Sequence, residues 1–465
     1  MKRQLLIVPL ALALTVSALA APTKTSTTSN RVLGVNVVLT TDISQPILKQ
    51  LAYYGKVRDV VLEIRAVTLQ TTADKLPLLQ ALPFVAAANP DAARAGAPVD
   101  TVPVPDFADG LSTWDLDAIN VTDIGFDNRQ VDFDGSGVYV AVLDTGLLDS
   151  WRAYFPQERI ATEYAACFGG GGGDVGFVSQ QPNKWEHDQN SHGTHVTSTI
   201  IGYQLGTVPV NGVAPMARVI PVKVLNQNGS GWSSVIARGI KYVADLKAGQ
   251  LAGSPVVINM SLGGSALDAM EKAAIDYAIG KGVIVVASAG NAGGAGMGYP
   301  GAYAPVISVA ASGWVGEWKY GSGAPGVNRY WWYNHNVPEP TSAADYYIAD
   351  FSSRALLGQD LDVAAPGSWV VGPYQVNSGH LSYYFLGGTS MASPHVAGIV
   401  ALMAQKAPAL TAAQAEAILE GSAIPLPAGC RTILNPDGST ADVCWGADAT
   451  GAGLATADAA LAATP

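Results

Sequence analysis

Short apolar runs alternate with helical patterns along much of this 465-residue chain, and that alternation constrains the fold more than any other feature. Uniformly apolar runs of this length are typical of strands buried on both faces. Strand-like runs lie at 138–143, 219–225, 256–259, 283–287, 306–310 and 361–364, and helical patterns at 233–247, 267–281 and 412–421. Strands that alternate with helices build a mainly parallel sheet with helices on both faces. The sequence therefore predicts an α/β fold for most of the chain.

A carboxylate and a histidine stand at the ends of two predicted elements. Asp144 closes the apolar run that begins at Val138. In open α/β sheets, the carboxyl ends of the strands form the edge at which ligands bind. His192 begins a later apolar stretch, and Ser191 before it is predicted to cap the helix that follows. An acid and a base thus precede the serine described next.

Ser390 lies at a position that suits a catalytic nucleophile. The small residues Gly387, Gly388 and Thr389 come directly before it, and the apolar period after it predicts a helix that begins near the serine. The positive field at a helix N-terminus suits a nucleophile whose attack creates negative charge. A serine at a helix start is also a common N-cap, so Ser390 taken alone does not establish an active site.

Asp144, His192 and Ser390 follow in the chain order acid, base, nucleophile, and their segments resemble those of the subtilisin-like serine peptidases, or subtilases. The resemblance extends from about Trp114 to Leu461. Two further segments match the family, Asn259-Met260-Ser261-Leu262-Gly263-Gly264 and Ala287-Ser288-Ala289-Gly290-Asn291. The resemblance implies a subtilisin-like three-layer α/β/α fold with a mainly parallel central sheet.

The same resemblance implies a serine endopeptidase that works through an acyl-enzyme intermediate and needs no cofactor for catalysis. Ser390 would attack the peptide carbonyl, neutral His192 would take its proton, and Asp144 would orient the imidazole. Asn291 and the backbone N–H of Ser390 would hold the oxyanion. The residues implied to bind substrate are Ser261, Leu262, Gly263, Ala289, Gly290 and Gly298, the last of which leaves room for a large apolar side chain.

Each of these residues also has an ordinary structural interpretation. Asp144 could cap a turn, and Asn291 could be a turn residue after Gly290. Two other functions therefore stand beside the peptidase: a catalytically silent peptide-binding module, and a serine esterase, although 286–290 lacks the first glycine of the G-x-S-x-G elbow. His195 and His395 are expected to pack or to form hydrogen bonds rather than to bind a metal.

The front of the chain is predicted to be removed. Residues 1–20 have the basic start, apolar run and small-residue end of a secretory signal peptide. Residues 21–105 are predicted to be a propeptide, since strands at 32–39, 60–69 and 84–88 alternate with helices at 45–54 and 74–82. Its position resembles the ferredoxin-like inhibitor unit of subtilases, which plugs the cleft with its C-terminal tail. An accessory domain that stays attached is the alternative.

Residues 89–105 are rich in proline and alanine and are expected to form an exposed linker. Self-cleavage is predicted between Ala92 and Gly110, and residues 106–465 would then form the catalytic domain. The expected partners are polypeptide substrates and the chain's own propeptide as inhibitor. A formal net charge of −11 argues against nucleic acid, and no second apolar run suggests a membrane span, so a secreted monomer is expected.

Three other features give weaker predictions. Asp132-Phe133-Asp134-Gly135-Ser136-Gly137 resembles a calcium loop but lacks its glutamate, so a turn is predicted there. Subtilases often carry a structural calcium, yet no metal ligand is identifiable from the sequence. Cys430 and Cys444 bracket a turn-like loop and could form a disulfide, which leaves Cys167 over. The aromatic-rich insertion 312–350 is either a substrate or partner surface or a self-packed flap.

Overall fold

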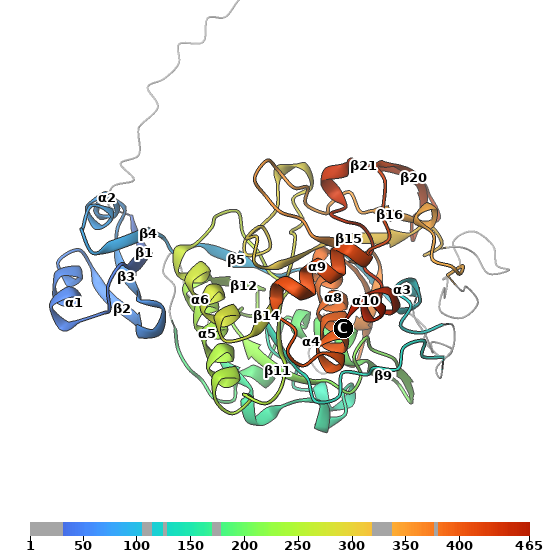
Figure 1. The fold of residues 1–465 in the computed structure, drawn as a ribbon, viewed down its shortest axis with the longest axis horizontal. Coiled ribbons are helices and arrows are strands. Elements are labelled where there is room, and N and C mark those ends of the chain that lie inside the picture. The colour runs from blue at the N-terminus through green and yellow to red at the C-terminus, as the bar shows by residue number, and fades with distance from the viewer. Residues whose placement is uncertain (1–30, 105–113, 124–127, 170–177, 319–336, 376–379) are drawn as a thin grey trace, which may run out of the picture.

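The computed structural model describes residues 31–104, 114–123, 128–169, 178–318, 337–375 and 380–465. Figure 1 shows a small N-terminal unit beside a much larger body. The predicted signal peptide, residues 1–20, lies outside the described residues. Among the helices that are described, none combines the length and the apolar character that crossing a membrane requires.

The small unit is a four-stranded antiparallel sheet covered by two helices. The sheet has the order β2-β3-β1-β4, which is the order of a ferredoxin-like unit. Its elements are β1 (Val32–Leu39), α1 (Gln45–Ala52), β2 (Lys56–Val61), β3 (Ala66–Thr72), α2 (Leu76–Gln80) and β4 (Val85–Pro90). Val35, Val37 and Leu69 are fully buried in its own small core. The predicted small α+β unit is therefore present.

The single strand predicted for 60–69 is wrong. Strands β2 and β3 form a hairpin there, joined by a 3₁₀ turn at Leu62–Ile64. Arg65 closes the turn with a φ of 52°. Turns with positive φ usually show glycine or asparagine in the sequence, and none stands at this position. An apolar run that continued through the turn hid the reversal.

The larger body is built on the predicted parallel sheet. Its strand order is β16-β15-β14-β13-β7-β11-β8, and β17 pairs with β15. Every pairing is parallel except that of the edge strand β16 with β15. The strands are β7 (Tyr139–Asp144), β8 (Ala166–Cys167), β11 (Arg218–Lys223), β13 (Val256–Met260), β14 (Val283–Ser288), β15 (Ile307–Trp314), β16 (Tyr346–Ile348) and β17 (Val363–Pro366).

Helices cover both faces of this sheet and bury two separate cores. Val140 and Val142 of β7 belong to one core, and Ala141 and Leu143 belong to the other, as the two-residue period of a strand requires. Helices α5 and α6 lie on one side and α4 and α8 on the other (Figure 1). The helices of the body are α3 (Trp114–Ala118), α4 (His192–Ile201), α5 (Ser233–Ala248), α6 (Ala269–Gly280), α8 (Thr389–Lys406), α9 (Ala412–Ser422) and α10 (Ala457–Ala463).

Residues 89–105 are not the exposed linker that was predicted. This stretch leaves the small unit and pairs with the body as two further strands, β5 (Ala93–Ala95) and β6 (Asp100–Pro103). Strand β5 pairs with β12 (Ser230–Trp232), and β6 pairs with β19 (Tyr383–Gly387), which also pairs with β18 (Val370–Pro373). Composition misled the prediction because backbone pairing to a distant strand leaves no local signal.

Two further features of local structure expected from the sequence are present among the described residues. Gly135 and Gly137 turn with φ values of 87° and 80°, and Asp134 accepts a bond from the Ser136 N–H at 2.9 Å. Cys430 and Cys444 form a disulfide across a hairpin. That hairpin consists of β20 (Gly429–Leu434) and β21 (Thr440–Trp445). Another hairpin is formed by β9 (Tyr203–Leu205) and β10 (Val208–Val210).

The described part of the aromatic insertion packs into the body. Trp314, Trp318, Tyr346 and Tyr347 are each less than 5% exposed, and the Tyr347 hydroxyl donates to buried Glu317 at 2.9 Å. Of the two alternatives for the insertion, these residues support the self-packed one. Residues 319–336, which hold the other aromatic side chains of the cluster, lie outside the described residues.

Candidate active site

Three elements of the body bring Asp144, His192 and Ser390 together. Asp144 ends strand β7, His192 is the first residue of α4, and Ser390 is the second residue of α8. Asp144 and His192 are fully buried, and Ser390 is 3% exposed. The predicted helix start beside the serine is present, although Gly388 rather than Ser390 is its N-cap. The site thus lies at the carboxyl edge of the sheet, as predicted.

Asp144 and His192 form a close pair. The His192 Nδ1 lies 2.9 Å from both carboxylate oxygens of Asp144. The N–H of Thr145 donates to the same carboxylate at 2.6 Å. A buried carboxylate is stabilised by such donors, and it fixes the tautomer in which the Nδ1 of the histidine carries hydrogen. The other ring nitrogen, Nε2, is thereby left as the base.

A close backbone approach makes this pairing geometrically possible. The first turn of α4 lies against the chain that follows β7, and a Cβ on Gly193 would lie 2.3 Å from the Gly146 carbonyl oxygen. Gly146 itself has a φ of 92°, in the region that favours glycine. Any side chain at Gly193 would force helix α4 away from β7. His192 would then lose its contact with Asp144.

Ser191 does not cap α4, contrary to the prediction. It has a φ of 81° and no capping bond, and its hydroxyl instead donates to the Gln375 carbonyl at 2.9 Å. Two other side chains bind the first N–H groups of the helix. Asn190 accepts from the His192 N–H at 3.3 Å, and Thr145 accepts from the Gly193 N–H at 2.9 Å. The general preference for serine at helix starts could not show which neighbouring side chains accept hydrogen bonds from these N–H groups.

Ser390 is held at the end of strand β13. Its hydroxyl donates to the Ser261 carbonyl at 3.2 Å, and the Ser261 hydroxyl donates to the Ser390 carbonyl at 2.8 Å. The His192 Nε2 has no hydrogen-bond partner among the described residues. Catalytic hydrogen bonds often tighten only when substrate is bound.

Thr389 orients the side chain of Asn291, a role that the sequence analysis did not predict. Both the N–H and the hydroxyl of Thr389 donate to the Asn291 side-chain oxygen, at 2.9 and 2.8 Å. Because its oxygen is engaged, the amide presents its N–H groups to the cleft, where Asn291 and Ser390 line the same pocket. The signal was available, since Thr389 is the direct neighbour of Ser390, but nothing local connects it to residue 291.

The chain's own residues 93–104 run through this cleft. Ala95 and Gly263 exchange two backbone bonds of 2.9 Å, and the Gly96 N–H donates to the Gly229 carbonyl at 2.9 Å. Beyond the site, the Val99 N–H donates to the Gly387 carbonyl at 2.7 Å. Ala97, between these contacts, lines the pocket shared by Ser390 and Asn291. These contacts lie on both sides of Ser390 and therefore place the Ala97–Pro98 peptide bond beside it.

The comparisons with known proteins agree with this geometry. The model of the subtilase family matches residues 135–452, which is more than half of the chain. The chain belongs to the subtilase family. A thermostable alkaline protease of Halalkalibacterium halodurans is 34% identical over 277 residues, or 60% of this chain and 59% of that protein. The match thus spans about three fifths of that relative.

Two further proteins are similar to this subtilase, one in sequence and one in fold. Subtilisin DY of Bacillus licheniformis is 36% identical over 295 residues, which cover 63% of this chain and 85% of that protein. Fervidolysin of Fervidobacterium pennivorans, described as a keratinolytic enzyme related to subtilisin, has a TM-score of 0.63 at 24% identity. That comparison covers 93% of this chain and 61% of fervidolysin, and it supports the fold alone.

The predicted substrate-binding residues of the subtilase divide into three groups. Gly263, Gly290 and Gly298 line a pocket of about 580 Å³ beside Ser390, and the described side chains around it carry no charge. Ser261 holds Ser390, as described above. Leu262 and Ala289 are 1% and 0% exposed and belong to the hydrophobic cores. Their backbones lie at the cleft while their side chains support it from behind.

The other two histidines of α4 and α8 have structural hydrogen bonds, as predicted. His195 Nε2 bonds to the Val370 carbonyl at 3.1 Å, and complete burial lowers the pKa of His195 to about 3. His395 bonds to the Met391 carbonyl and to Asp115, at 2.8 and 2.9 Å. His195 is therefore neutral throughout the physiological pH range, next to the helix turn that carries His192.

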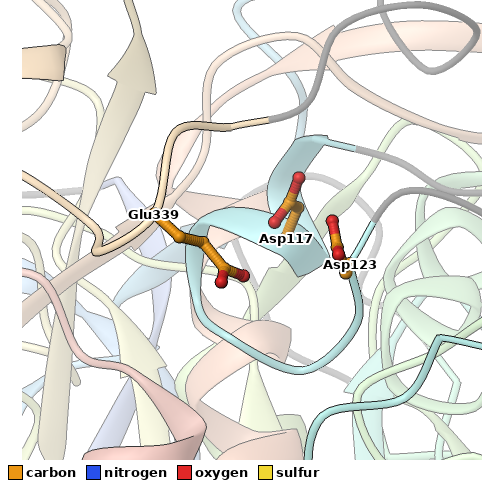
Figure 2. A group of neighbouring side chains, drawn as sticks. All are labelled: Asp117, Asp123 and Glu339. Atoms are coloured by element: carbon orange, nitrogen blue, oxygen red, sulfur yellow. The ribbon is translucent and has the colours of Figure 1, made fainter.

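Two groups of carboxylates could hold a divalent cation. Asp117, Asp123 and Glu339 place ligand oxygens within 4.8 Å of one another, and so do Asp360, Asp362 and Glu416. Figure 2 shows the first group, in which Asp117 and Asp123 lie side by side and Glu339 reaches in from a segment distant in sequence.

Asp117 is the buried member of the first group. It is 4% exposed, and its Oδ1 has no hydrogen-bond partner among the described residues. Its Oδ2 accepts one bond, from the Val337 N–H at 2.9 Å. Burial raises the pKa of Asp117 to about 7. In the second group, Asp362 is similar: burial raises its pKa to about 7, and its Oδ1 has no hydrogen-bond partner among the described residues. Its Oδ2 accepts two bonds from Ser308, whereas the Oδ2 of Asp117 accepts one, so Asp117 keeps more acceptor capacity for a cation.

Proposed function

We propose that this subtilase is a serine endopeptidase that cleaves polypeptides through an acyl-enzyme intermediate. The observation that carries the proposal is the fully buried Asp144–His192 pair beside Ser390, at the point where the chain's own strand crosses the cleft. An extended peptide held by backbone bonds is how a protein binds a polypeptide substrate. Subtilisin DY and the thermostable alkaline protease, which are similar to this chain, bear the names of proteases.

In the proposed reaction, Ser390 Oγ attacks the carbonyl carbon of the scissile bond, and His192 Nε2 takes its proton. The peptide C–N bond then breaks, and the imidazolium returns the proton to the leaving nitrogen. Water, activated by the same His192, attacks the ester carbonyl and releases Ser390. Asp144 stabilises the imidazolium in each half-reaction and does not itself become protonated.

The negative oxygen of each tetrahedral intermediate needs donors that are already in place. The Asn291 amide and the Ser390 N–H are the proposed donors, and Thr389 holds the amide in position through the two bonds to its oxygen. Loss of one such donor costs about 10²- to 10³-fold in kcat, a magnitude measured in subtilisin itself. Thr389 is therefore proposed as a positioning residue for this step.

The proposal includes secretion as a zymogen with an inhibitory propeptide. Its support is the course of residues 93–103, which lie in the cleft as a substrate would and continue on both sides of Ser390. Residues 1–20 supply the signal-like sequence. A catalytically silent peptide-binding module would need a defect among Asp144, His192, Ser390 or Asn291, and all four side chains are in place. An esterase would not require the backbone pairing sites on both sides of the serine.

The first prediction concerns self-processing. Ser390→Ala should accumulate as uncleaved precursor, because the nucleophile is lost while the cleft still binds residues 93–103. The wild type should be cut between Ala92 and Gly110, with Pro98 as the new N-terminus if the register in the cleft is the processing register. N-terminal sequencing of both secreted proteins is the measurement, with Ser136→Ala on the surface as the control. Normal processing of Ser390→Ala would contradict the proposed function.

The second prediction concerns Thr389. Thr389→Val keeps the shape of the side chain but removes one of two donors to Asn291, so kcat should fall by about tenfold, less than loss of the donor itself. KM should change little, because the interaction is needed in the transition state. Thr389→Ser should restore kcat. Steady-state kinetics on a peptide anilide distinguish this role from a structural one, which would show no rescue by serine.

We also propose that calcium binds at Asp117, Asp123 and Glu339. Calcium takes several oxygen ligands at 2.3–2.6 Å, and three carboxylate oxygens within 4.8 Å of each other fit around it. An ion there would satisfy the orphaned Asp117 oxygen and join α3 to the segment that carries Glu339. Its role would be stability alone, because these residues are separate from the triad.

Removal of calcium should therefore lower thermal stability. In a Ser390→Ala background, which prevents self-digestion, calcium at about 100 times its dissociation constant adds about 2.7 kcal/mol, or roughly 4 °C in Tm. Asp117→Asn should lose this response, while Asp362→Asn in the second group should keep it. Calorimetry with calcium or a chelator provides the measurement. An equal response of Asp117→Asn and the parent would exclude this site.

A further inference from the structure

Arg94 lies in the cleft with its charge completely buried. It is the middle residue of β5, and its side chain is 0% exposed. The Nε donates to both oxygens of Glu271 at 3.1 and 3.2 Å, and an Nη forms a further short contact with the same carboxylate. The Ala266 carbonyl accepts another bond at 2.9 Å. Besides the neighbouring Ala93 carbonyl, which accepts from an Nη at 3.0 Å, the acceptors of the guanidinium belong to the larger body.

The site that receives Arg94 is built into the start of helix α6. Glu271 is in the first turn and is 1% exposed. Asp268, the N-cap, accepts the N–H groups of Met270 and Glu271 at 2.9 and 3.2 Å. The positive end of the helix favours both carboxylates. Burial raises the pKa of Glu271, and the Arg94 guanidinium opposes that shift.

The backbone register fixes the place of Arg94 relative to the scissile bond. Ala97 lies beside Ser390, and counting back from it along the chain, Arg94 is the fourth residue before the bond. Burial alternates along the strand, since Arg94 and Gly96 are buried while Ala93, Ala95 and Ala97 are exposed. This alternation is that of a strand with one face on the body. A substrate in the same register would direct its fourth side chain toward Glu271.

We propose that Glu271 makes this enzyme select a basic residue, arginine before lysine, at the fourth position before the scissile bond. The inference rests on the proposed peptidase function and adds a determinant of its specificity. After the propeptide leaves, the body keeps the Glu271 carboxylate and the Ala266 carbonyl, the two acceptors that it contributes to the Arg94 guanidinium. A guanidinium can engage both carboxylate oxygens at once, whereas an ammonium acts as a point charge. An apolar side chain would leave the carboxylate buried without a partner.

The experiment uses the processed enzyme secreted from the full chain. The probes are four peptide anilides that differ only at the fourth position, which is arginine, citrulline, lysine or leucine. Citrulline has the size of arginine without its charge, so the ratio of kcat/KM between the two isolates the ion pair. We expect a ratio of about ten or more in the wild type, since hydrogen bonds to charged groups are the strong ones. Lysine should lie between arginine and citrulline.

Glu271→Gln should bring the arginine-to-citrulline ratio close to one. Asp276→Asn removes one carboxylate from the exposed side of the same helix, and it should keep the wild-type ratio. A wild-type ratio near one, with all four peptides cleaved, would overturn the specificity proposal and leave the peptidase function intact. Failure to cleave any of the peptides would count against the peptidase function itself. The wild-type series decides the proposal even if Glu271→Gln does not mature.

Discussion

The buried contact between Asp144 and His192 is the constraint on which the rest of the site depends. Both side chains are removed from water, so the buried Asp144 carboxylate depends on the His192 Nδ1 and the Thr145 N–H as its donors. The contact requires β7 to end where α4 begins. That closeness in turn requires Gly193, because any Cβ there would meet the Gly146 carbonyl. The helix geometry and the chemistry are therefore fixed by the same residues.

The sequence was sufficient for the sheet because the signals of its strands are local, whereas the proposed triad was identified through the resemblance to a family. An apolar run ending in Asp144 predicts a strand and its edge, and the residues around Ser390 predict a helix start. The errors occurred where the deciding contact is distant. Ser191 looks like a cap, but its hydroxyl bonds to Gln375, 184 residues away. The hairpin at Arg65 was hidden because no turn residue marks it.

Arg94 is the clearest case of a functional residue that the sequence alone could not reveal. It stands in a proline- and alanine-rich stretch, and its partner Glu271 is 177 residues away. An isolated arginine among small residues is usually a solvated side chain, because burial of a charge is costly without a partner. Only the pairing of β5 with β12, which carries no local sequence signal, brings it to the start of α6.

The start of helix α6 contacts the N-terminal part of the chain at two carboxylates, Asp268 and Glu271. Asn36 of the small unit donates to Asp268 and to Asp91, each at 2.9 Å, while Arg94 occupies Glu271. In the proposed zymogen, cleavage beside Ala97 would break the chain but none of these contacts, so the cut propeptide would remain bound. A substrate with a basic residue at the fourth position would compete with Arg94 for one carboxylate. In the proposed zymogen, Glu271 would therefore serve both substrate specificity and inhibition, and a substitution that weakens its ion pair would weaken both.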